Sequence, residues 1–164
     1  MDARQRLLIS ETDLQCGFGL AAYRDAASAV QHRDPADFWR HMQSLLTAAL
    51  HLRQLLVREA GLRATLGIPS DSAILNPDLE AVADPGRVFD VWVRAHPRGP
   101  LRLTNFGPLG ISHADPAVFA RYFDAESSTL LLYGTTFHLP DLLIAMAAVK
   151  AEAASQLRQI QALV

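Results

Sequence analysis

The sequence of 164 residues predicts a mainly all-α protein, a bundle of four or five helices with short additional helices and one small β-hairpin near 128–138. Three observations predict this fold. Two long segments repeat apolar residues at spacings of three and four, and Asp-Pro or Asn-Pro pairs mark several helix starts. Only the window 128–138 departs from the helical spacing. A chain of this length forms one domain, so we expect a single bundle over 1–164.

The longest helical pattern runs from Pro35 to Glu59, and we expect it to be the central helix. Its main apolar row consists of Phe38, Met42, Leu45, Ala49, Leu52 and Leu56. A second row consists of Trp39, Leu46, Leu50 and Val57. Two adjacent rows make a buried arc wider than that of a two-stranded coiled coil, so this helix should contact neighbours on at least two sides.

Proline pairs mark the helix starts. In each pair an Asp or Asn side chain can accept bonds from the first free N–H groups, and the following proline needs no donor. The pairs are Asp34-Pro35, Asn76-Pro77, Asp84-Pro85 and Asp115-Pro116. They predict the start of the central helix and short helices at 77–83, 85–96 and 116–123. We expect Gly61 to end the central helix, with a further turn or two before Gly67 and Pro69.

Two further long helices complete the predicted bundle. The first should start after Ser10 or Thr12 and run to about His32, with an apolar face of Leu14, Phe18, Ala21, Ala22 and Val30. Gly17 and Gly19 either break it or allow another backbone to pack closely, and we favour close packing. The last helix begins at Asp141. Between Pro97 and His113, prolines and glycines predict an irregular connection. In 128–138, β-branched and aromatic residues around Gly134 predict the hairpin.

One side of the central segment is polar. Its stripe consists of Arg40, Ser44, Thr47, His51, Gln54 and Arg58, opposite the apolar rows. No acid lies between Asp37 and Glu59, so the stripe is the most concentrated positive feature. It is either a solvated helix face or a binding site for an anionic ligand or partner formed by Arg40, His51 and Arg58. We expect Arg40 or His51 to be hydrogen-bonded to protein or to an anion.

An alternative site is a divalent metal bound by Asp34, Asp37 and His41, which share one helical face. Helix capping already accounts for the two acids, so we prefer the structural interpretation. The six histidines form no HExxH motif, and neither GxxxxGK nor GxGxxG is present. We therefore expect no cofactor. Cys16 has no basic neighbour nearer than Arg24 in sequence, and we interpret it as a structural thiol.

Charge and composition indicate which classes of partner and which cellular compartment to expect. The formal net charge of −2 is spread evenly, so charge does not support a nucleic-acid partner. A single cysteine requires no oxidising compartment. The first residues contain too short an apolar run for a signal peptide, and no uncharged apolar run approaches a membrane span. We expect a cytoplasmic protein. Fourteen of the fifteen Lys and Arg residues are Arg, which is typical of a GC-rich bacterial genome.

Several segments together resemble the helical HEPN domains, in particular an uncharacterised bacterial branch. The likeness covers about 36–150 and is carried by Phe38-Trp39 with Leu45, Leu46 and Ala49; Leu62-Arg63-x-x-Leu66-Gly67-Ile68 before Ser72; Phe89-Asp90-x-Trp92; and Arg121-Tyr122-Phe123-Asp124. It implies a helical bundle, often homodimeric, in a family that includes ribonucleases of defence systems. Catalytic members use an Arg and a His four to six residues later. No Arg in this chain is followed by a His at that spacing, so the resemblance implies a fold and no catalytic residues.

These observations favour a non-enzymatic helical bundle that acts as an interaction or ligand-sensing module, as a homodimer. The alternative is an enzyme, either a divergent HEPN-type ribonuclease or a metal-dependent hydrolase that uses Asp34, Asp37 and His41.

Overall fold

The structure is a computed structural model that describes residues 2–97, 102–107 and 119–162. Its long helices are α1 (Ala3–Gln31), α2 (Pro35–Arg58) and α6 (Leu139–Gln161). The shorter ones are α3 (Ala60–Thr65), the 3₁₀ turn η1 (Ala73–Leu75), α4 (Asp78–Ala83) and α5 (Pro85–Ala95). The strands are β1 (Arg102–Gly107), β2 (Phe119–Asp124), β3 (Thr129–Leu132) and β4 (Thr135–His138). Helix makes up more than half of the chain, which confirms the mainly all-α prediction.

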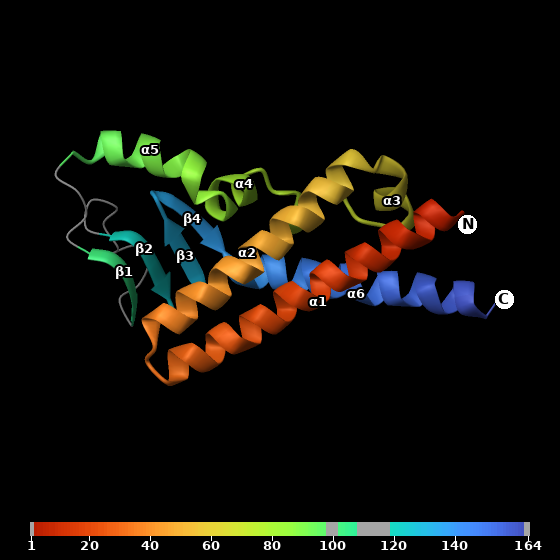
Figure 1. The fold of residues 1–164 in the computed structure, drawn as a ribbon, viewed down its shortest axis with the longest axis horizontal. Helices are drawn as coiled ribbons and strands as arrows, with labels where there is room; N and C mark the ends of the chain where they lie inside the picture. Colours follow the sequence, from red (N-terminus) through yellow and green to blue (C-terminus); the bar gives the residue numbers. More distant parts are fainter. Residues whose placement is uncertain (1, 98–101, 108–118, 163–164) are drawn as a thin grey trace.

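The three long helices form the body of the molecule, and the sheet lies at one end of it (Figure 1). α1 packs against both α2 and α6. The start of α1 and the end of α6 lie at the opposite end from the sheet, and the start of α1 is beside α3. α5 lies on the other side of the sheet from the start of α2, where Trp92 packs against Tyr133 at the turn between β3 and β4. No described helix is long and apolar enough to cross a membrane.

α2 forms as its sequence predicts. All six residues of the main apolar row are buried, as are Trp39 and Leu46 of the second row, but Leu50 is only partly buried and Val57 is 54% exposed. The Asp34 carboxylate accepts a bond from the Asp37 N–H at 3.0 Å and caps the helix. The broad buried face explains why α2 contacts α1, α3, α4, η1 and β1.

The end of α2 differs from the prediction. The helix ends at Arg58, where the backbone bends at Glu59, and Gly61 lies inside α3 instead of ending α2. The glycine that ends a helix here is Gly67, with φ of +59°. Its N–H bonds the carbonyl of Ala64, and the next N–H, of Ile68, reaches back to Arg63. Glycine adopts this left-handed conformation without a Cβ penalty, so it suits the position after α3.

α1 begins earlier than predicted. Asp2 caps it by accepting a bond from the Gln5 N–H at 2.7 Å, so the helix starts at Ala3 and not after Ser10 or Thr12. An acid followed three residues later by Gln is a capping signal that proline spacing does not reveal. The helix continues unbroken through both glycines. A Cβ on Gly19 would lie 2.4 Å from Met146 Cε, so α1 and α6 pack closely there, but the close neighbour is a side chain and not the expected backbone.

The predicted hairpin is present as β3 and β4, but it belongs to a four-stranded sheet of order β1-β2-β3-β4. β2, β3 and β4 pair antiparallel, and β1 joins β2 in parallel. Tyr133 and Gly134 both have positive φ, the conformation of a tight hairpin turn.

The prediction of a helix at 116–123 is wrong, as is the confinement of strand to 128–138. β2 occupies 119–124, and β1 lies in the stretch predicted to be irregular. Five of the six β2 residues are buried, on both faces of the sheet, and aromatic residues favour that environment. The Asp115-Pro116 pair that suggested a helix start lies outside the described residues.

Candidate functional site

The polar stripe of α2 lies on the outer side of the helix, as predicted. Arg40, Ser44, Thr47, His51 and Arg58 are exposed and Gln54 is partly buried. Arg40 donates to the Asp37 carboxylate through Nε at 3.2 Å and also through Nη2, which confirms that Arg40 is hydrogen-bonded to protein. This hydrogen bond holds the pKa of Asp37 below its usual value. The Arg40 charge is therefore balanced within its own helix.

A groove of about 570 Å³ runs between α1 and α2. His41, Ser44, Thr47 and His51 line it from α2, and Gln15, Phe18, Ala21 and Asp25 line it from α1. His51 is thus the predicted ligand-binding residue that reaches a hollow, while Arg40 and Arg58 lie outside its lining. His41 lies between two acids, with Nδ1 3.8 Å from Asp25 and Nε2 3.5 Å from Asp37. We call this hollow the α1–α2 groove.

The residues of the alternative metal site have other contacts. Asp34 caps α2, and Asp37 accepts from Arg40 and lies near His41. Over the described residues no group of three or more His, Cys, Asp or Glu side chains is arranged to hold a metal ion. The sequence spacing of Asp34, Asp37 and His41 therefore does not produce a three-ligand cluster.

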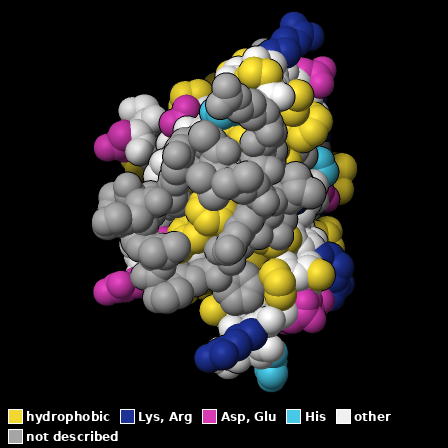
Figure 2. Space-filling view, turned by 90° about the vertical axis from the view of Figure 1, so that its left-hand side faces the viewer, with side chains coloured by type: hydrophobic (Ala, Val, Ile, Leu, Met, Phe, Trp, Pro, Cys, Tyr) yellow, Lys and Arg dark blue, Asp and Glu magenta, His cyan; other side chains and the backbone are white. Residues whose placement is uncertain are grey.

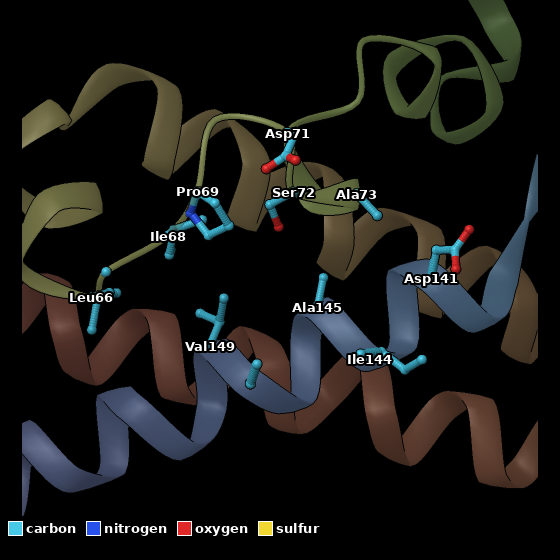
Figure 3. A pocket seen from close by; sticks show the side chains of 12 residues that line it. Leu66, Ile68, Pro69, Asp71, Ser72, Ala73, Asp141, Ile144, Ala145 and Val149 are labelled. Carbon is cyan, nitrogen blue, oxygen red and sulfur yellow. The ribbon is translucent and has the colours of Figure 1, made fainter.

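A second hollow, of about 420 Å³, lies between the segment 66–73 and α6. Val149 lies across it from Ile68 and Pro69, while Asp71 lies at its upper edge (Figure 3). The described residues that line it include Ser72 but no His, Lys or Arg. Asp141, at one end, is hydrogen-bonded to His138 at 2.9 Å. This hollow was not predicted, since the sequence marks 67–69 only as a helix end.

Three large apolar side chains are exposed on α1, beside exposed charged residues such as Glu11. Leu7, Leu14 and Phe18 are 69%, 46% and 56% exposed, whereas α1 buries Ile9, Thr12, Cys16, Gly19, Ala22, Ala26 and Ala29. The predicted buried face, which included Leu14 and Phe18, is therefore wrong for those two residues. Leu7, Leu14 and Phe18 lie at spacings of seven and four, so they share one side of the helix. We call them the α1 seam.

The sheet end of the molecule carries mixed charge. Figure 2 looks onto this end, where the described side chains include both positive and negative groups around hydrophobic ones. A surface that binds the nucleic-acid backbone gathers Lys and Arg on one face. The described part of this end does not favour such a partner.

Cys16 is fully buried in α1, and burial raises the pKa of its thiol to about 12. The reactive form of cysteine is the thiolate, which is scarce at neutral pH when the pKa is this high. We expect maleimide labelling of the folded protein to be slow and to accelerate on unfolding in urea. Labelling of the folded protein as fast as that of free cysteine would contradict the structural role of this thiol.

Comparison of the chain with protein-family models, curated proteins and solved structures found no match.

Proposed function

We propose that this protein is a non-enzymatic interaction module that functions as a homodimer. The observation that carries the proposal is the α1 seam, whose three large apolar side chains face outward on a helix already packed on two sides. Single apolar side chains are ordinary on protein surfaces. Three that share one side of a long helix are compatible with contact to a second helix.

The hollows lined by the described residues favour binding of a ligand or partner over catalysis. Ser44 lines the α1–α2 groove, and its Oγ donates to the carbonyl of Arg40 in its own helix. A nucleophilic site needs a hydroxyl or thiol aimed at a base. The thiol of Cys16, the single cysteine, is buried, and burial raises its pKa. These contacts favour an interaction module over the ribonuclease or hydrolase alternatives.

Sedimentation equilibrium tests the proposal directly. We expect the native protein to show the mass of a dimer at micromolar concentration and to dissociate on dilution. A monomer mass over the whole accessible concentration range, up to the millimolar level, would refute homodimerisation.

Incubation with RNA tests the enzyme alternative. Because no Arg is followed by a His at the spacing of the catalytic HEPN members, we expect structured and unstructured RNA to remain intact beyond a buffer control. Cleavage that disappears when any one of the six histidines is replaced by alanine would contradict the non-enzymatic proposal.

A further inference from the structure

The hollow between the segment 66–73 and α6 lies under a stretch of backbone that is fixed at both ends. The segment follows α3 and closes in a turn, in which the N–H of Ser72 bonds the carbonyl of Pro69 at 3.2 Å. η1, which comes next, packs against α6. On the α6 side the lining includes Ala145 and Ala148, whose side chains are too short to fill the space. The hollow is therefore a built feature of the fold.

This hollow has the size and the composition of a small-molecule site. Its volume of about 420 Å³ lies within the range of small-ligand pockets, about 300–1,000 Å³. Most of the side chains that line it are apolar, and Leu66, Ile68 and Val149 among them also belong to the hydrophobic core. A pocket of this kind holds an apolar body and orients it through a few polar groups.

Two polar side chains of the hollow are available to a ligand. The Asp71 carboxylate and the Ser72 hydroxyl are neighbours in the chain, and neither has a hydrogen-bond or ion-pair partner among the described residues. Asp71 lies at the upper edge, and the Ser72 oxygen is directed toward α6 (Figure 3). Asp141, the other acid of the lining, is already hydrogen-bonded to His138. Asp71 is therefore the carboxylate that a ligand would meet.

The charges at the hollow select a cation. Asp71 and Asp141 are both acids, and no Lys, Arg or His is among the described residues that line it. An anionic ligand would be repelled by both carboxylates, whereas a cation is attracted by both. An ammonium group carries three N–H donors, so it can bond the Asp71 carboxylate and the Ser72 hydroxyl together.

We propose that this hollow binds a small organic amine, with the ammonium group at Asp71 and the apolar body between the segment 66–73 and α6. A free small molecule suits the site better than a protein partner, because a stable protein interface buries about 800 Å² on each side and this lining is confined to one segment and one helix. The inference goes beyond the homodimer and does not depend on it, since no residue of the α1 seam lines the hollow.

Titration of the full chain with phenethylamine, followed by the backbone amide signals in NMR spectra, tests the proposal. We expect the signals of 66–73 and 141–149 to shift, with a dissociation constant of about 1 mM or lower, an ordinary affinity for a ligand this small. Phenethyl alcohol and phenylacetate carry the same ring without the positive charge. Both should bind at least about fivefold more weakly, because they lose the charge-assisted bond to Asp71.

A charge-removing variant tests the role of Asp71. Asp71→Asn keeps the shape of the side chain, so we expect the dissociation constant of phenethylamine to rise at least about fivefold while that of phenethyl alcohol stays the same. The matched control is Asp90→Asn. Asp90 is also an exposed acid, but it lies on α5 and does not line the hollow, so its replacement should change neither constant.

A filling variant tests where the apolar body lies. Ala147 and Ala148 are both exposed on α6, but only Ala148 lines the hollow. Leucine at position 148 would occupy the space, so Ala148→Leu should weaken binding of the amine and of the alcohol at least about tenfold, while Ala147→Leu should bind as the native protein does. Leucine favours helix and both positions are exposed, so circular dichroism should show unchanged helix content in both variants.

The outcomes decide the inference separately from the proposed function. Equal affinity for the amine, the alcohol and the carboxylate would overturn it, as would equal effects of Asp71→Asn and Asp90→Asn. Binding that survives Ala148→Leu would place the ligand elsewhere and overturn it too, and so would the absence of any shift up to the highest soluble concentration of phenethylamine. A protein that binds the amine at this hollow and sediments as a monomer would support the inference while refuting the homodimer.

Discussion

Replacing Phe38 with alanine is expected to lower the free energy of unfolding by about 3–5 kcal/mol, the range for removal of a buried aromatic ring. Phe38 is 1% exposed near the start of α2. Its ring lies edge-on to Trp39 at a centroid distance of 5.0 Å and 4.7 Å from the ring of Phe123 in β2. The substitution therefore removes a contact between the helical body and the sheet as well as apolar burial within α2.

Urea unfolding followed by circular dichroism measures this loss as a lower transition midpoint with an unchanged slope. Phe38→Leu keeps an apolar side chain and should cost less than the alanine variant. The matched surface control is Val57→Ala in the same helix, which should change the unfolding free energy by less than about 0.5 kcal/mol. Equal effects of Phe38→Ala and Val57→Ala would contradict the buried position of Phe38.

The sequence predicted α2 because several signals agree there. The proline pair, the Asp34 cap and two adjacent apolar rows all indicate one helix over one range, and the structure places its bounds within a residue of the expected ones. Agreement of local signals with the final fold is what makes an element predictable from sequence.

The sheet was under-predicted because its strands depend on non-local pairing. Only the β3–β4 hairpin has a local signal, the turn at Tyr133 and Gly134. β2 is held between β1 and β3, and its register with β3 aligns Tyr122 with Leu131. A short aromatic run is compatible with a buried helix or a buried strand, and spacing alone does not separate the two.

The candidate site was partly predictable. Spacing placed the polar stripe on the outer side of α2, but it could not show that Arg40 is held by Asp37 or that His51 reaches a groove. On α1 the apolar residues fall into two rows. Both rows have helical spacing, and only the position of α6, fixed by Gly19 against Met146, decides that Cys16 faces inward and Leu14 outward.

Replacing Gly17 or Gly19 of α1 with alanine is expected to change the free energy of unfolding in opposite directions. At Gly17 an alanine Cβ would lie 3.5 Å from Lys150 Nζ, an ordinary contact. Because alanine favours a helix interior over glycine by about 1 kcal/mol, Gly17→Ala should stabilise the protein by up to that amount. The measurement is the free energy of unfolding in urea, compared with the native protein.

At Gly19 the added Cβ would lie 2.4 Å from Met146 Cε and 3.3 Å from Leu45 Cδ1. Both side chains are fully buried, so a shift of the methionine methyl disturbs a packed core, at a cost of about 1–3 kcal/mol. This cost exceeds the helix preference of alanine, and Gly19→Ala should therefore destabilise the protein, with Gly19→Val more severe. In a double-mutant cycle, Met146→Ala should cost less in the Gly19→Ala background than alone, because it removes the clashing atoms. Two alanine variants that stabilise the protein equally, with no coupling to Met146, would mean that α1 and α6 do not pack at this distance.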